Sequence, residues 1–180
     1  MTRTCLCLIF RPAPGGGREV LLGYKKAGFG AGRWVGLGGH LEDGEKPADA
    51  AVREVAEESG LVVPPDSLSR VASLTFVFPA RPSWDQTAEV FATTQYAGEA
   101  AESDELVPRW FEVTGLPFDG MWDDARHWLP VVLAGGQVTA TITFAPDCAT
   151  VAAIDPELSA APAPTEGRRA AATSQSSPGD

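Results

Sequence analysis

The sequence predicts a single α/β domain in which a mixed β-sheet is sandwiched between helices. Eight short segments have the length and the apolar patterning of strands, and two others have helical punctuation. The chain has 180 residues, of which 44% are hydrophobic, enough for one domain with a substantial core. We expect this domain to span residues 1–158. Residues 159–180 are rich in Ala, Pro, Ser, Thr and Gly, which predicts a disordered tail.

The expected strands are segments in which apolar residues run together or alternate with polar ones. Glycine- and proline-rich loops, such as residues 12–17, separate them. In chain order the expected strands are Thr4–Phe10, Glu19–Tyr24, Trp34–Leu37, Leu68–Phe78, Glu89–Gln95, Arg109–Val113, Val138–Phe144 and Ala149–Ile154.

Two helices are expected, at residues 47–59 and at about 123–133. The first has Pro47 in its first turn and Gly60 just past its end, an asymmetry typical of helix termini. The second ends before a pair of glycines. A turn of 100° per residue gives the first helix one stripe toward the core, formed by Ala48, Ala51, Val52, Val55 and Ser59.

Charge and cysteine content limit the partners and the compartment. The 14 basic and 24 acidic residues give a net charge of −10, so we expect neither a nucleic-acid polymer nor a membrane as partner. Cys5, Cys7 and Cys148 have no disulfide-like spacing and are interpreted as ordinary residues in a reducing compartment. The first segment lacks a signal-peptide cleavage pattern. We therefore expect a cytoplasmic protein, and a monomer because nothing indicates a protein partner.

Three glutamates on the first helix carry the strongest chemical signal. Glu54, Glu57 and Glu58 are spaced i, i+3 and i+4, where like charges repel, and Arg53 is the only basic residue of the helix. A merely acidic surface is one explanation. The other is a bound cation that offsets the repulsion, and carboxylate oxygens suit Mg²⁺ or Mn²⁺. The glycines of the preceding segment 36–39 allow the backbone to approach a ligand closely.

The spacing of these residues resembles the Nudix box. Gly39, Glu45 and the segment 53–61 match it at every specified position. The resemblance implies an α/β/α sandwich with a loop–helix–loop. It also implies a metal-dependent enzyme that cleaves a diphosphate bond in a nucleoside diphosphate linked to another group.

The resemblance also implies roles for individual residues. Glu54, Glu57 and Glu58 are expected to hold the metal together with the Gly38 carbonyl, while Glu45 and Arg53 form a supporting ion pair. A carboxylate takes the proton of the attacking water. The sequence leaves three candidates for that base, which are Glu54, Glu58 and Glu105, and Glu105 is also a candidate metal ligand.

Similarity extends beyond the box, over about residues 3–155, to the oxidised purine nucleoside triphosphate hydrolases. Its segments are residues 21–26, 28–34, 102–105, 110–111, 117–118, 121–124 and 128–130. It implies Mg²⁺-dependent hydrolysis of substrates such as 8-oxo-dGTP to the monophosphate and pyrophosphate, which would sanitise the nucleotide pool. Other Nudix substrates, namely an ordinary nucleoside triphosphate, a nucleotide sugar or ADP-ribose, stay open. So does a non-catalytic nucleotide sensor, although the intact box argues against it.

The candidate substrate pocket follows from these segments. Trp122 offers a face for base stacking, Phe29, Phe76 and Phe78 offer apolar walls, and a pair of aspartates can read the base edge. The full set of candidate contacts is Cys5, Lys25, Phe29, Val35, Leu37, Gly38, Gly39, Phe76, Phe78, Trp122, Asp123 and Asp124. The alternatives are core packing for the aromatic residues, a helix N-terminus for the aspartates and a solvated surface for the lysine.

Three departures from the family affect base readout. Val35 stands where the family has an asparagine that bonds the purine, and the family has a threonine near Cys5. The family's Trp-Pro-Asp-Asp segment lacks its proline here. Ungapped alignment then puts Asp124 on the first family aspartate and Ala125 on the second, whereas a one-residue shift would restore the pair. We therefore expect catalysis to be retained and base preference to be shifted or broadened.

Overall fold

The computed structural model describes residues 1–156, so the expected tail lies outside the described residues. The strands are β1 (Thr2–Pro12), β2 (Arg18–Lys25), β3 (Trp34–Val35), β4 (Ser69–Val77), β5 (Gln86–Thr93), β6 (Leu106–Glu112), β7 (Val138–Phe144) and β8 (Val151–Asp155). The helices are α1 (Pro47–Ser59) and α2 (Ala125–Leu133), with short 3₁₀ turns at Pro65–Ser67, Pro82–Trp84 and Phe118–Gly120.

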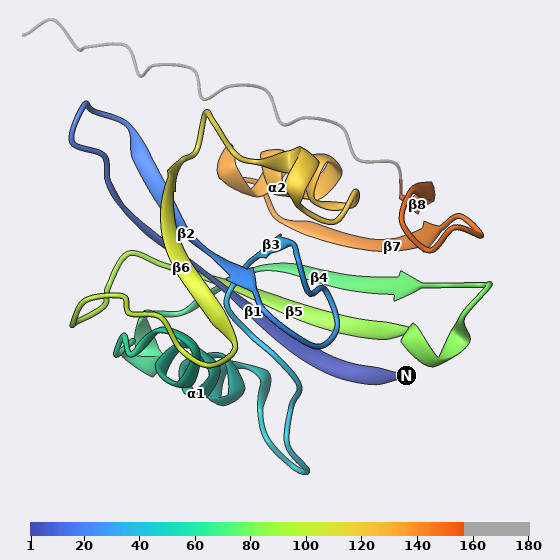
Figure 1. Cartoon of the computed structure of the whole chain (residues 1–180), viewed down its shortest axis with the longest axis horizontal. Coiled ribbons are helices and arrows are strands. Elements are labelled where there is room, and N and C mark those ends of the chain that lie inside the picture. Colours follow the sequence, from blue (N-terminus) through green and yellow to red (C-terminus); the bar gives the residue numbers. More distant parts are fainter. Residues whose placement is uncertain (157–180) are drawn as a thin grey trace, which may run out of the picture.

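The strands form one mixed sheet in the order β3-β2-β1-β5-β4-β7-β8, and β6 also pairs with β2. The pairs β1–β5 and β4–β7 are parallel and the remaining pairs are antiparallel. Helices α1 and α2 lie on opposite faces of the sheet (Figure 1). The predicted class, a mixed sheet between helices, is therefore confirmed.

Alternation along β1 divides the core into two layers. Cys5, Cys7 and Ile9 are buried under α1, whereas Leu8 and Phe10 are buried under α2. This is the period-two pattern of a strand covered on both faces. The larger layer, under α2, also receives the aromatic side chains of β4 and β7, and it borders the cavity described below.

Expected and observed elements differ mainly at their ends. The expected strand Trp34–Leu37 is shorter, because after Val35 the segment continues only as an isolated bridge between Leu37 and Cys7. Helix α1 has the expected bounds, and Gly60 ends it with a φ of 73° while its N–H bonds the carbonyl of Ala56.

The buried face of α1 is rotated from the expected one. Ala51, Val55 and Ser59 are buried as predicted, but Ala48 and Val52 are only partly so, and Ala50 and Glu58 are buried instead. The apolar pattern could not reveal a buried glutamate. Glu58 turns inward because a backbone N–H from a glycine segment meets its carboxylate there.

The cysteines and the helices bear on the expected compartment. Within residues 1–156, Cys5, Cys7 and Cys148 are all free thiols, and the first two are fully buried. Burial raises the pKa of Cys5 to about 11 and that of Cys7 to about 12, so both stay protonated at neutral pH. No helix in this part of the chain has the length and hydropathy to span a bilayer.

Candidate active site

Two glycines bring the backbone against the carboxylates of α1. The Gly38 N–H donates to Glu58 Oε2 at 2.8 Å. A Cβ at Gly39 would lie 2.6 Å from Glu54 Oε1, and one at Gly38 would lie 2.1 Å from the Cys5 carbonyl oxygen. Residues 38 and 39 must therefore be glycine if Glu54 and Glu58 are to keep these positions.

Arg53 orients the acidic side chains of the site. Its Nε and Nη2 donate to the two carboxylate oxygens of Glu45 at 2.9 and 2.8 Å, a planar fork that a lysine cannot reproduce. Its Nη1 donates to Glu54 at 2.9 Å and to Glu57 at 3.3 Å. Its Nη2 also bonds the His40 carbonyl, which ties the glycine segment to α1.

This arrangement changes the proton affinity of the paired groups. The Arg53 hydrogen bonds, followed by the N–H of Glu42, lower the pKa of Glu45 to about 2. The same pairing raises the pKa of Arg53. Glu45 and Arg53 therefore stay charged throughout the physiological range. They form the ion pair that the resemblance to the Nudix box implies.

Glu58 sits in a different environment because its side chain is only 2% exposed. Burial raises its pKa to about 7, against the opposing effects of the Gly38 N–H and the Lys25 ammonium. Lys25 Nζ lies 3.8 Å from Glu58 and 3.7 Å from Glu105. Lys25 is thus placed between the two carboxylates rather than on a solvated surface.

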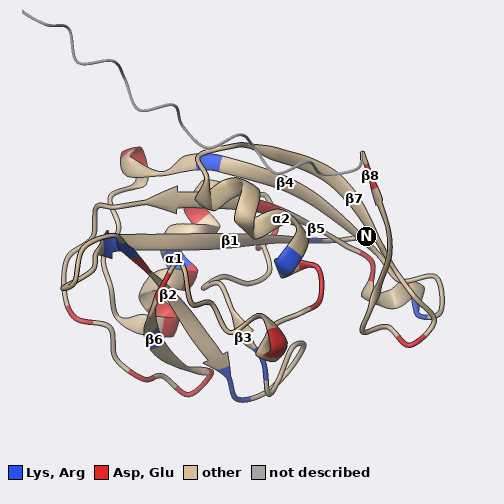
Figure 2. Cartoon of the chain, turned by 90° about the horizontal axis from the view of Figure 1, so that it is seen from above, with Lys and Arg blue, Asp and Glu red and all other residues tan. Residues whose placement is uncertain are grey.

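An acidic cleft opens beside this end of α1. It is lined by Lys26, Glu57, Glu58, Glu102, Ser103, Asp104 and Glu105. Figure 2 marks the acidic positions on α1. Lys26 bonds Glu102 and the Ser103 carbonyl at its rim, while the Glu57 side chain is 61% exposed and its carboxylate bonds Arg53.

The donor set fits a divalent cation. Carboxylate and carbonyl oxygens are the ligands that Mg²⁺ and Mn²⁺ prefer, and Glu54, Glu57 and Glu58 project from one helix beside a glycine backbone. Within residues 1–156, no three carboxylate, imidazole or thiol groups already converge on one point at metal-binding distance. In this structure Arg53 bonds the carboxylates of Glu54 and Glu57, and the Gly38 N–H bonds that of Glu58.

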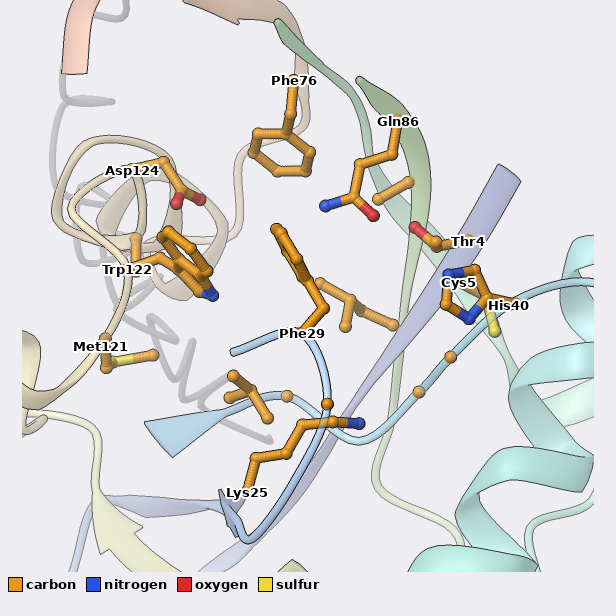
Figure 3. Close-up of a pocket in the computed structure, with 18 of the residues that line it drawn as sticks. Thr4, Cys5, Lys25, Phe29, His40, Phe76, Gln86, Met121, Trp122 and Asp124 are labelled. Atoms are coloured by element: carbon orange, nitrogen blue, oxygen red, sulfur yellow. The ribbon is translucent and has the colours of Figure 1, made fainter. Parts of the chain in front are cut away.

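A cavity of about 350 Å³ lies between the sheet and α2. Its lining comes from β1 to β5 and β7, from the loop after β2, from the glycine segment, and from α2 and the loop before it (Figure 3). Of the predicted contacts, the cavity includes Cys5, Lys25, Phe29, Val35, Gly38, Gly39, Phe76, Phe78, Trp122 and Asp124. Lys25, Gly38 and Gly39 also lie beside the carboxylates of Glu54 and Glu58. Glu105 lines both the cavity and the acidic cleft, so the two adjoin.

Flat aromatic surfaces form one end of the cavity. The rings of Phe29 and Trp122 stack with centroids 5.0 Å apart and an interplanar angle of 18°, and Arg33 lies over the Trp122 ring at 4.4 Å. Phe78 stacks on Phe144 at 4.4 Å and meets Trp122 edge to face. Phe29, Phe78, Trp122 and Phe144 thus pack against one another and also line the cavity.

Only one of the two predicted aspartates reaches the cavity. Asp124 lines it and accepts the Trp128 indole N–H at 2.8 Å. Asp123 points elsewhere, because its carboxylate accepts the Val151 N–H at 2.9 Å and pairs with Arg126 at 3.0 Å. Ala125 is the next lining residue, as in the ungapped alignment. Burial raises the pKa of Asp124 to about 6, so it becomes a hydrogen-bond donor in mildly acidic conditions.

The side chains of two other predicted contacts, Leu37 and Cys5, belong to the hydrophobic core under α1. Leu37 is fully buried under α1 and does not line the cavity. Cys5 borders the cavity, but its side chain belongs to the core under α1.

Sequence reasoning missed several lining residues, notably Thr4, Trp34, Gly36, His40, Gln86, Met121 and Phe144. Strand alternation contained a signal for two of them. Thr4 precedes Leu6 and Leu8 at a spacing of two, and Gln86 precedes Ala88 and Val90 in the same way.

Residues 2–132 match the family model described as NUDIX domain, and the chain belongs to the Nudix hydrolase family. Its relatives include the oxidized purine nucleoside triphosphate hydrolases of Danio rerio and Mus musculus. The first is 42% identical over 132 residues, which cover 73% of this chain and 81% of the relative. The second is 41% identical over 128 residues, covering 71% and 77%.

A solved structure supports the same fold. The MutT protein of Bacillus halodurans has a TM-score of 0.70 at 22% identity, covering 88% of this chain and 100% of that one. The domain match and the two relatives confirm the predicted family, and this structure confirms the fold. Nudix enzymes generally use divalent metal ions, which agrees with the oxygen-rich donor set.

We predict that Gly39→Ala impairs activity without unfolding the protein. The new Cβ would displace the flexible Glu54 carboxylate, 2.6 Å away, while the backbone need not move. Turnover should fall about 10–100-fold, as for other losses of ligand orientation, and the melting temperature should change little. Gly15→Ala is the matched control, because nothing lies within 4 Å of its new Cβ. Equal activities of the two variants would contradict the proposed role of this contact.

We also predict that Asp124→Asn stabilises the protein at pH 7. The folded state raises the pKa of Asp124 from 3.8 to about 6, so it binds more protons than the unfolded state across that window. Stability from this group therefore falls as pH rises through the window, by at most about 3 kcal/mol. Asparagine stays neutral and keeps an oxygen for the Trp128 N–H.

Chemical denaturation between pH 4 and 8 measures this effect. The variant should be more stable than the wild type at pH 7, and the two should converge near pH 4. Asp119→Asn, at a fully exposed position, is the control. A variant that is less stable at pH 7, with a pH profile parallel to that of the wild type, would contradict the assigned burial cost.

Proposed function

We propose that this protein hydrolyses oxidised purine (deoxy)nucleoside triphosphates, such as 8-oxo-dGTP, to the monophosphate and pyrophosphate with Mg²⁺, and that Mn²⁺ can replace it. The observation that carries the proposal is the continuity of two features. A carboxylate cluster on α1 opens into a cavity with stacked aromatic rings, and Lys25, Gly38 and Gly39 border both. Relatives at 41–42% identity are named for this activity.

In the proposed metal site, Glu54, Glu57, Glu58 and the Gly38 carbonyl hold the cation, and Glu105 is a further candidate ligand. When bound, the cation supplies Lewis acidity to the phosphate and lowers the pKa of an attacking water. Arg53 holds Glu54 and Glu57 in orientation through its two Nη1 hydrogen bonds. Lys25 adds positive charge where an anionic polyphosphate would meet these carboxylates.

The base that accepts the water's proton is one of three carboxylates, Glu54, Glu58 or Glu105. Burial raises the pKa of Glu58 to about 7, and a cation held by this carboxylate would lower it again, so the pKa does not select the base among the three. Glu54 and Glu105 are the other candidates for the base, because both lie at the same site.

The proposed base pocket uses the aromatic end of the cavity. Phe29, Phe76 and Phe78 supply the apolar wall. Trp122 packs against Phe29 and Arg33, so a base would stack on its ring by displacing one of these two side chains. Val35 lines the cavity without a polar group, and Asp124 is the one aspartate there. This composition supports a shifted or broadened base preference.

We further propose that the protein acts as a cytoplasmic monomer on free nucleotides. The two fully buried, unpaired thiols of Cys5 and Cys7 suit a reducing compartment. The net charge of −10 opposes binding of a nucleic-acid polymer.

Pyrophosphate release tests the proposal directly. The wild type is incubated with Mg²⁺ and low concentrations of 8-oxo-dGTP, 2-hydroxy-dATP or each normal dNTP. We expect metal-dependent release of pyrophosphate and a clear preference for an oxidised purine. Glu57→Gln should abolish release while the circular-dichroism spectrum is unchanged, because it removes a charge from the metal site and not from the core.

Two outcomes of this assay would count against the proposal. Equal turnover of normal and oxidised nucleotides would move the search to other nucleoside diphosphate derivatives. Near-wild-type activity of Glu57→Gln would contradict the assigned metal site.

We predict that Val35→Asn restores part of the missing base readout. An amide in this position of β3 can both donate to and accept from a purine edge, whereas valine can do neither. The ratio of kcat/KM for 8-oxo-dGTP to that for dGTP should rise roughly tenfold, the value of one neutral hydrogen bond. Val62→Asn, at an exposed site outside the cavity, is the control. An unchanged ratio would mean that position 35 does not read the base.

A further inference from the structure

We propose that the side-chain amide of Gln86 reads the polar edge of the base in this cavity. The inference deepens the proposed function, on which it rests, by naming a specificity-determining residue. Gln86 is the first residue of β5 and lines the cavity. In Figure 3 its amide is directed into the cavity, across from Trp122 and Asp124.

The strand register fixes this placement. Gln86 pairs with Phe76 on β4 and with Thr2 on β1, and Ala88, two residues along, pairs with Thr4. Residues two apart on a strand share a face, and both Gln86 and Ala88 line the cavity. The amide thus extends from the first residue of a central strand, which is paired with β1 and β4 on its two sides.

The amide of Gln86 is uncommitted. Among residues 1–156, no hydrogen bond joins it to another residue, and its nitrogen and oxygen are not sealed from solvent. Its polar neighbours are engaged: Thr4 Oγ1 donates to the Thr87 carbonyl at 2.9 Å, and Asp124 accepts from Trp128. The packing of the protein therefore gives this amide no partner of its own.

A ligand that fills the cavity would remove water from the amide. A polar group that loses water without gaining a partner costs free energy, so the cavity favours a base that offers it a donor or an acceptor. A glutamine amide supplies both, and glutamine can form paired hydrogen bonds with a purine edge. With Val35 apolar, Gln86 provides a polar contact from the wall opposite Asp124.

Binding of nucleoside monophosphates tests this inference independently of catalysis. Calorimetric titrations with 8-oxo-dGMP, dGMP, dAMP and dCMP are compared for the wild type, Gln86→Met and Gln86→Glu. Methionine keeps the length of the side chain without its hydrogen bonds, and glutamate replaces the amide donor with an acceptor. Gln95→Met is the matched control, because Gln95 is exposed and lies outside the cavity.

Base-dependent effects are expected. Gln86→Met should weaken the tightest-binding purine about tenfold, the value of one hydrogen bond, and should narrow the ratio between the tightest and weakest bases. Gln86→Glu should change the order of preference, and Gln95→Met should change neither. Melting temperatures confirm that each variant is folded.

The inference is overturned if Gln86→Met and Gln86→Glu change all affinities by one factor, or if the wild type binds all four monophosphates equally or binds none. Failure of the proposed function is a separate result. In that case the wild type would bind bases selectively and Gln86→Met would alter the selectivity, yet oxidised purine triphosphates would not be hydrolysed.

Discussion

The close approach of the Gly38–Gly39 backbone to the α1 carboxylates is the constraint on which the site depends. The Gly38 N–H holds Glu58, and the Gly39 Cα leaves room for Glu54 that any Cβ would fill. The approach also requires β1, because the Cys5 carbonyl lies against Gly38 from the other side. Sheet, glycine segment and helix therefore meet closely: a Cβ at Gly38 would clash with the Cys5 backbone, and one at Gly39 would displace the Glu54 carboxylate.

Charge balance explains how three glutamates coexist on one face of a short helix. Arg53 bonds Glu45, Glu54 and Glu57, so a single guanidinium offsets part of the repulsion. Glu58 is separated from this network by burial and by Lys25, and its pKa is raised to about 7. The remaining acidic excess makes the site attractive to a divalent cation, and the cation in turn makes it attractive to a polyphosphate. This order of events reconciles an acidic protein with an anionic substrate.

The sequence predicted the elements whose signals are local. Pro47 and Gly60 mark the ends of α1, and the spacing of the box identified its carboxylates before their geometry was known. The sequence was a poorer guide to the residues that line the cavity. Gln86, Thr4 and Phe144 come from strands far apart in the sequence, and the pairings β1–β5, β5–β4 and β4–β7 bring them to one face.

The aspartate pair illustrates the same limit. Asp123 and Asp124 are adjacent just before α2, yet their side chains point in different directions. Asp123 pairs with Arg126, three residues on, and accepts the N–H of Val151 from β8. A linear alignment identifies such positions but cannot decide which side chain faces the ligand. Leu37 likewise follows a lining residue yet points into the core. Tertiary packing decides which of two neighbouring side chains faces the cavity and which faces the core.

A crystal structure with Mn²⁺ and 8-oxo-dGMP would test the central claim most directly, because manganese is located by its anomalous scattering. The account predicts a manganese peak within coordination distance of Glu54, Glu57, Glu58 or the Gly38 carbonyl, with the base against Trp122 and the phosphate toward Lys25. A metal bound away from α1, or a base outside the cavity between the sheet and α2, would contradict it.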